Sequence, residues 1–307
     1  MVNKKLPVLF SIITYLASSI TSVFVNKYML ITNILDTIFL IFLQHLSCLV
    51  FLFIFKSYLS KIQKEDDVKN EFFTLYEGIK HLWPLIISFN FTLIFGNLCL
   101  KYTIISSYQL ARSMTLPFNF IFSYFFFKHI KFNFFMICSC ILVSIGFFIF
   151  SADAINTNHK AVIYGIIVSI GQAIHLNLLK QKLIVYKNKM KMLHYNLIYS
   201  SIILFIYLLI TGRILQILNL TYHGFTLLIL SCLSSICVTF SSFMCIYYTD
   251  NVAYNMIGNV KSTLQTFLSK FYNSEEFNTS TMIGIILTTL GSFTYGYSSE
   301  YSKKKIN

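Results

Sequence analysis

Long apolar stretches follow one another along almost the whole chain, separated by short polar segments. A helix needs about 20 apolar residues to cross a bilayer, and each stretch is about that long. The pattern predicts ten membrane-spanning helices and leaves no room for a large soluble domain. The expected spans are 6–25, 33–55, 82–100, 103–127, 133–151, 161–179, 193–211, 225–247, 251–272 and 280–298. The fold class is therefore an all-α polytopic membrane protein, with the segment 6–25 as its first span rather than a cleaved signal peptide.

The composition supports this class. Of the 307 residues, 56% are hydrophobic and 11% are charged, whereas a soluble domain carries roughly 25% charged residues. The net charge of +13 lies mainly in the segments that ten spans place on the side of the two termini: seventeen of the 24 Lys and Arg residues are there and five are on the other side. This asymmetry predicts cytosolic termini and argues against nucleic-acid binding.

Enzymatic and metal-binding functions find little support. The sequence has none of the nucleophile, phosphate-loop or zinc-protease motifs, and its seven His residues are dispersed. The seven cysteines lie in apolar runs without a CxxC pair, so we expect small core residues rather than metal ligands or disulfides. We expect no enzyme activity, no cofactor and no metal.

Two cations lie inside expected spans. Arg112 is in the fourth span and Lys261 in the ninth, within the similar words RSMT and KST. A cation near the bilayer centre costs about 2.5–3.5 kcal/mol on insertion scales, and it usually faces a cavity or a partner. Because no acidic residue lies at membrane depth in any expected span, the pair predicts a cavity for an anionic solute.

The positions of these cations suggest an internal repeat. Division of the chain into 1–154 and 155–307 gives two halves of five spans, with one cation in the fourth span of each half. An odd number of spans makes the two halves insert with opposite orientation, and inverted repeats place a substrate site near the midplane at their interface. We therefore expect two inverted five-helix repeats, the second followed by a basic cytosolic tail.

Four sequence motifs stand out: SSITSVFVNKYML at 18–30, GNLCLKY at 96–102, ARSMT at 111–115 and NMIGNVK at 255–261. These motifs resemble those of the GDP-fucose transporters, which are nucleotide-sugar transporters of the drug/metabolite transporter superfamily. The resemblance covers most of the chain in scattered blocks. It implies ten helices in inverted repeats, residence in the Golgi or endoplasmic reticulum membrane, and exchange of cytosolic GDP-fucose for luminal GMP. The ninth span lacks the GALNK word of relatives that carry GDP-mannose.

The resemblance and the chemistry of a GDP-sugar together give candidate binding residues. Lys261, as a point charge, and Arg112, as a planar fork, suit the diphosphate, although Arg112 could instead bind backbone carbonyls. The amide of Asn196 matches the guanine edge, in a place where those relatives have an FYNN motif and this chain keeps only Tyr195-Asn196.

Four further residues are candidates for the same cavity. Asn255 can bind hydroxyl groups, and Gly258 lets a substrate approach the backbone. Tyr195 and Tyr254 can stack on the base or the sugar. Lys27, near the end of the first span, is a candidate contact at the luminal gate, with snorkelling to the interface as its alternative.

Other interpretations remain open. The chain could carry GDP-mannose, a UDP-sugar or a triose phosphate, or it could be a non-transporting receptor or trafficking regulator. The expected partners are a nucleotide-sugar, a nucleoside monophosphate and the lipid bilayer, and a homodimer is also open. Lys304 and Lys305 resemble a C-terminal dilysine signal, which coat proteins recognise during retrieval to the endoplasmic reticulum.

Overall fold

The computed structural model describes residues 5–62, 75–125, 134–185, 189–248, 251–273 and 279–304, and all regular structure in them is helical. The elements are α1 (Lys5–Ile31), α2 (Thr37–Ile62), α3 (Leu75–Tyr102), α4 (Ile105–Ser113), α5 (Thr115–Phe125), α6 (Phe134–Val185), α7 (Lys189–Ile210), the 3-10 helix η1 (Arg213–Asn219), α8 (Tyr222–Tyr248), α9 (Asn251–Asn273) and α10 (Thr279–Lys304). Within the described residues, seven helical stretches are long and apolar enough to cross a membrane. The all-helical membrane class is confirmed, and the number of ten spans stays a prediction.

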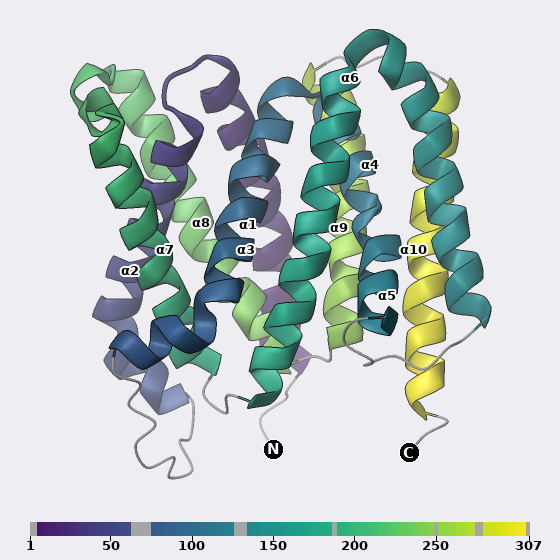
Figure 1. Ribbon diagram of the computed structural model, residues 1–307, viewed down its shortest axis with the longest axis horizontal. Coiled ribbons are helices and arrows are strands. Elements are labelled where there is room, and N and C mark those ends of the chain that lie inside the picture. The colour runs from purple at the N-terminus through teal and green to yellow at the C-terminus, as the bar shows by residue number, and fades with distance from the viewer. Residues whose placement is uncertain are drawn as a thin grey trace.

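The helices of the structure differ from the expected spans in two places. The expected span 103–127 is divided into α4 and α5 at Met114, because Pro117 has no N–H to donate to the carbonyl of Ser113. The expected spans 133–151 and 161–179 both belong to the single helix α6. Figure 1 shows that α6 bends over at the top of the view and returns, so that the expected connection between the two spans is itself helical.

The helices lie side by side across the view of Figure 1, with α2, α7 and α8 on the left and α9, α5 and α10 on the right. The helix α6 packs against α3, α4, α5 and α10, and α9 contacts α1, α4 and α10. The start of α1 and the end of α10 lie at the lower face in this view, and the end of α1 lies at the upper face.

Buried polar side chains join the helices on the left of the bundle. The Oδ1 atom of Asn26 (α1) accepts hydrogen bonds from Gln44 Nε2 (α2, 3.1 Å) and from Ser231 Oγ (α8, 2.8 Å). All three side chains are buried. Hydrogen bonds between helices of this kind stabilise membrane bundles, since apolar side chains gain little from leaving an apolar solvent.

Further polar contacts join helix ends at the face of the bundle where α1 ends. Lys101 Nζ, at the end of α3, donates to Asn33 Oδ1 at 2.7 Å. Arg213 Nη1 forms an ion pair with Asp36 Oδ1 at 2.8 Å, and the hydrogen bond and the negative charge of Asp36 raise the pKa of the Arg213 guanidinium. The backbone N–H of Asp36 donates to Gln216 Oε1 at 3.0 Å. These contacts hold the end of α3 and η1 against the α1–α2 connection.

Glycines set the close approach of α6 and α10. A Cβ atom at Gly284 would lie 2.9 Å from the carbonyl oxygen of Gly146, and a Cβ at Gly291 would lie 3.0 Å from the carbonyl oxygen of Ser139. Since the opposing atoms belong to backbone, no side chain can move aside to make room. The small residues therefore allow the two helices to pack backbone to backbone.

We expect Gly284→Ala to destabilise the protein, because the added methyl group forces α10 away from α6. Overpacking costs about 1–3 kcal/mol, which exceeds the gain of up to about 1 kcal/mol from replacing a helical glycine by alanine. The measurement is the melting temperature of the purified protein in detergent. Gly258→Ala is the matched control, since a Cβ there meets no atom within 4 Å. A Gly284→Ala protein that melts at or above the temperature of the Gly258→Ala protein would contradict the packing argument.

Candidate functional site

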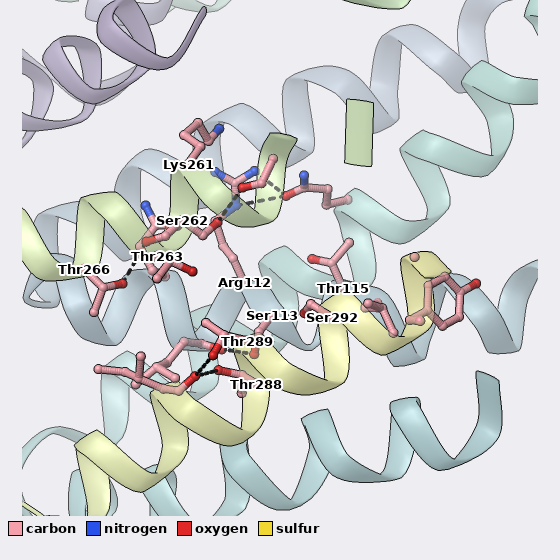
Figure 2. A pocket seen from close by; sticks show the side chains of 18 of the residues that line it. Arg112, Ser113, Thr115, Lys261, Ser262, Thr263, Thr266, Thr288, Thr289 and Ser292 are labelled. Carbon is pink, nitrogen blue, oxygen red and sulfur yellow. Dashed lines mark hydrogen bonds between the residues drawn. The ribbon is translucent and has the colours of Figure 1, made fainter. Parts of the chain in front are cut away.

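A cavity of about 310 Å³ lies between the middle parts of six helices, within the usual range of ligand pockets, about 300–1,000 Å³. Its lining comes from α1, α4, α5, α6, α9 and α10. Hydroxyl and amide side chains predominate, as Figure 2 shows for α9 and α10. The polar residues of the lining are Tyr15, Gln109, Arg112, Ser113, Thr115, Asn119, Gln172, Lys261, Ser262, Thr263, Thr266, Thr288, Thr289, Ser292 and Tyr295.

Arg112 reaches this cavity from the last turn of α4. Its Nε and Nη2 atoms both donate to Gln172 Oε1 on α6, at 3.1 and 2.8 Å, and its Nη1 donates to Tyr108 Oη at 3.0 Å. A guanidinium has five N–H donors, so these contacts orient it and leave two donors for a ligand. Its partners are an amide and a phenol, which do not cancel its charge.

Lys261 reaches the same cavity from α9. Its Nζ atom lies 3.4 Å from Tyr15 Oη and 5.3 Å from the centre of the Tyr15 ring. The negative face of an aromatic ring attracts an ammonium group, and Tyr15 therefore holds Lys261 without neutralising it. An ammonium has three N–H donors, so Lys261 also keeps donors for a ligand.

An amide bridge fixes α9 relative to its neighbours. Gln109 Nε2 on α4 donates to Gln265 Oε1 on α9 at 2.5 Å, and Gln265 Nε2 donates to the carbonyl oxygen of Ser19 on α1 at 3.0 Å. Gln109 and Gln265 are both buried. Because Gln109 precedes Arg112 by about one turn and Gln265 follows Lys261 by about one turn, this bridge holds the helices that carry the two cations.

Among the described residues that line the cavity, none is Asp or Glu. The ion pair between Arg213 and Asp36 lies at the upper face of the bundle, away from the lining. The described part of the chain also contains no group of three His, Cys, Asp or Glu residues that could hold a metal ion. The described lining thus presents two positive charges, several hydroxyl groups and no negative side chain, which suits a polyanionic ligand.

Besides Pro117, contacts with α6 accompany the break between α4 and α5. The carbonyl oxygen of Ala111 accepts from the N–H of Met114 at 3.3 Å and from Ser169 Oγ on α6 at 2.7 Å. Gly165 lets α6 come close to Ala111, since a Cβ at Gly165 would overlap the Ala111 side chain. The Ser169 hydroxyl of α6 thus donates to a backbone carbonyl of α4 one residue before Arg112. Interrupted helices of this kind form the substrate sites of many transporters.

The structure brings some of the predicted site residues together. Lys261, Arg112 and Gly258 line one cavity, and a Cβ at Gly258 meets no atom within 4 Å. The partners of Arg112 are side chains rather than the backbone carbonyls considered above. The side chains of Tyr254 and Asn255 lie outside the described part of the structure, as do the side chain of Lys304 and all of Lys305.

Tyr195 and Asn196 lie elsewhere, because α7 packs on α2 and α3 and does not border the cavity. The Tyr195 ring stacks on Tyr199, with ring centres 6.1 Å apart, and both belong to a core cluster with residues of α3. Asn196 is buried, and its Oδ1 atom has no hydrogen-bond partner among the described residues. The structure thus separates these residues from the two cations, and the contact of Asn196 with guanine stays a prediction.

Lys27 also lies outside the cavity lining. Its side chain is buried, and its Nζ atom donates to the carbonyl oxygen of Leu100 at 2.7 Å and to that of Thr103. These carbonyls lie at the end of α3 and in the connection to α4, so the ammonium caps a helix end. In this structure Lys27 neither snorkels to an interface nor reaches the cavity, and a contact with substrate stays a prediction.

Several cavity residues were not predicted from the sequence, chiefly Tyr15, Gln172, Thr115 and the hydroxyl row of α10. One signal was present. The helices α9 and α10 are long enough to cross a membrane but are not among the seven apolar stretches of the described residues, and both contribute to the lining. A span that is less apolar than its neighbours indicates a cavity wall.

Comparisons with known proteins agree with a transport protein. The chain is 29% identical to a protein named GDP-fucose transporter 1 from Dictyostelium discoideum, over 95% of this chain and 80% of that protein. It is 26% identical to GDP-fucose transporter 1 of Mus musculus, over 85% of this chain and 74% of that protein. It is 24% identical to "GDP-fucose transporter, Golgi" of Drosophila melanogaster, over 89% and 84%. No family model matches the chain.

We expect Lys27→Met to lower stability without a matching loss of ligand affinity, because Lys27 caps a helix end outside the cavity. A hydrogen bond to a charged group contributes about 1.5–3 kcal/mol, and its loss should lower the melting temperature in detergent by several degrees. Transport per folded molecule, measured after reconstitution, should stay close to that of the wild type. A variant with an unchanged melting temperature and lost transport would instead place Lys27 in contact with the solute.

Proposed function

The chain is a member of the GDP-fucose transporter family, and we propose that it is itself an antiporter that carries GDP-fucose in exchange for GMP. Because its relatives are transporters, it is a transport protein and not an enzyme. The direction we propose is entry of GDP-fucose into the lumen of the Golgi or the endoplasmic reticulum, with both termini in the cytosol, as the distribution of Lys and Arg predicts.

One observation carries the proposal: Arg112 and Lys261 share a cavity, and none of the described residues that line it is a carboxylate. Each cation is held by neutral groups that leave its charge in place. In a cavity of low dielectric constant, an unpaired charge acts on a ligand with less screening than in water. A diphosphate supplies the missing negative charge, and the free N–H groups of the two cations supply its hydrogen bonds.

The two cations suit different parts of the same ligand. A guanidinium can bind two phosphate oxygens at once in its plane, whereas an ammonium acts as a point charge with rotatable donors. Since Gln172 and Tyr108 fix the guanidinium of Arg112 on two sides, its open donors have a defined direction. Lys261 rests on an aromatic face and keeps more freedom to follow a phosphate group.

We propose further that the bundle contains ten spans in two inverted repeats, 1–154 and 155–307. In that count α4 and α5 together make the fourth span, α6 makes the fifth and the sixth, and α9 makes the ninth. The helix α6 counts as two spans because it contains two separate apolar stretches, Phe134–Ser151 and Val162–Lys182. Arg112 and Lys261 then occupy equivalent helices of the two repeats, which is where such folds place their substrate site.

The positive charges of Arg112 and Lys261 also favour exchange over uniport. An empty carrier would have to change its conformation with two unpaired cations in its cavity, whereas either a nucleotide-sugar or a nucleoside monophosphate neutralises them. We therefore propose that a bound anion on either side lowers the barrier to reorientation, which couples the two movements. Uniport would require the carrier to return empty, at a cost that comes from the low-dielectric surroundings of Arg112 and Lys261.

The direct test is uptake of labelled GDP-fucose into proteoliposomes that contain the purified protein. We expect uptake to be faster when the vesicles are loaded with GMP, and to be inhibited by unlabelled GDP-fucose and GMP. Equal uptake into empty and loaded vesicles would contradict exchange. Inhibition by UDP-sugars or triose phosphates, with none by GMP, would retain a carrier of phosphorylated solutes but contradict GDP-fucose as its substrate.

Lys261→Gln tests the role of the cavity charge in the same assay. We expect it to weaken GDP-fucose binding at least about tenfold, since about 1.4 kcal/mol corresponds to a factor of ten. Lys160→Gln is the matched control, because Lys160 is exposed and lies outside the cavity lining. A similar loss of GDP-fucose binding in both variants would mean that the overall positive charge of the protein, rather than the charge in the cavity, attracts the nucleotide.

Gln172→Glu tests whether Arg112 must stay unpaired. A carboxylate in place of the amide would pair with the guanidinium, and two opposite charges 4 Å apart attract by about 4 kcal/mol at an effective dielectric constant of about 20. We expect an unchanged or higher melting temperature together with a strong loss of GDP-fucose uptake. Gln172→Met, which removes the hydrogen bonds but adds no charge, should lose less uptake. Full uptake by Gln172→Glu would show that Arg112 does not bind the anion.

A further inference from the structure

The cavity has two sides of different chemistry. Arg112 and Lys261 come from α4 and α9, which also contribute the hydroxyl groups of Ser113, Ser262, Thr263 and Thr266, whereas α5 and α10 contribute polar side chains without charge. Figure 2 shows α10, with Thr288, Thr289 and Ser292, across the cavity from Lys261. We define the hydroxyl wall as Thr115 of α5 with these three residues of α10.

Two of the four hydroxyl groups of the wall already donate their hydrogen atoms to backbone carbonyls of α10. Thr288 Oγ1 donates to the carbonyl oxygen of Gly284 at 2.8 Å, and Thr289 Oγ1 donates to that of Ile285 at 2.8 Å. A hydroxyl group has one hydrogen and two acceptor lone pairs. These two threonines therefore offer acceptors to a ligand. Acceptors repel the oxygens of a phosphate and attract the O–H groups of a sugar.

Thr115 differs from them, because its usual partner is occupied. A helical threonine commonly donates to the carbonyl four residues earlier, which here is Ala111. That oxygen already accepts from Ser169 Oγ and from the N–H of Met114. The Oγ1 atom of Thr115 is buried and has no hydrogen-bond partner among the described residues. Its hydroxyl can both donate and accept, and a polar atom left unpaired in this way indicates a place for a ligand group.

We infer that the hydroxyl wall is the subsite for the hexose of the nucleotide-sugar, with Thr115 as its main contact. The inference rests on the proposed function and adds to it a place for the neutral, polyhydroxylated part of the substrate. Arg112 and Lys261 hold the diphosphate, and the sugar beyond it lies against α5 and α10. A nucleoside monophosphate has no hexose, so it binds the cations without using the hydroxyl wall.

The test compares two competitors against uptake of labelled GMP into proteoliposomes loaded with GMP. In Thr115→Val, we expect the inhibition constant of GDP-fucose to rise about fivefold to tenfold, the latter being about 1.4 kcal/mol, while that of GMP changes less than about twofold. Thr289→Val should give a smaller rise in the same direction. Thr226→Val is the matched control, because Thr226 is exposed on α8, away from the cavity, and its hydroxyl donates to its own helix.

Each outcome decides the inference. If the inhibition constants of GDP-fucose and GMP rise equally, the hydroxyl wall contacts the nucleotide. If neither threonine variant changes either constant, the hydroxyl wall contacts no part of the ligand. Both results overturn the sugar subsite and leave the proposed function standing. A wild-type protein that does not exchange GMP, or that GDP-fucose does not inhibit, overturns the proposed function and the subsite with it. If Thr115→Val melts below the wild type, Thr289→Val carries the comparison.

Discussion

The structure depends on one constraint, which is that two positive charges lie in a membrane-embedded cavity whose described lining residues include no carboxylate. An isolated charge in such surroundings is unfavourable, and a nearby Asp or Glu would relieve it. The protein uses dipoles and an aromatic face instead, so that Gln172, Tyr108 and Tyr15 hold Arg112 and Lys261 without neutralising them. A carboxylate would stabilise the empty protein more, but it would also remove the positive potential that attracts an anion.

The same constraint explains which helices are the least apolar. The helices α4, α9 and α10 expose polar side chains to the cavity, and they need other helices between their polar faces and the lipid. The helix α6 fulfils this role by bending back on itself, so that it packs on α3, α4, α5 and α10. Glycines at the contact of α6 with α10 make that cover tight. The fold thus places its apolar helices around a polar interior.

The sequence predicted the helical membrane class and the shared cavity of Arg112 and Lys261, because hydropathy and an unpaired intramembrane charge are local signals. It did not predict that α6 is one helix, since a polar connection between apolar stretches can be helical or not. It also did not predict Gln172 or Thr115 as cavity residues. Their roles come from contacts between distant segments, such as that of Ser169 with Ala111, which no local pattern contains. Asn196 was predicted by resemblance to a motif, and the structure places it on a helix that does not border the cavity.

The cations of this bundle fall into two kinds, which sequence alone does not distinguish. Lys27 donates to backbone carbonyls and Arg213 pairs with Asp36, so these two charges complete contacts within the protein. Arg112 and Lys261 have neutral side-chain partners and open donors, so they have capacity for a ligand. The two kinds are connected, because α4 has 9 residues and joins the connection that Lys27 caps to the turn that carries Arg112. The contacts of Lys27 and the position of Arg112 are therefore linked through one short helix.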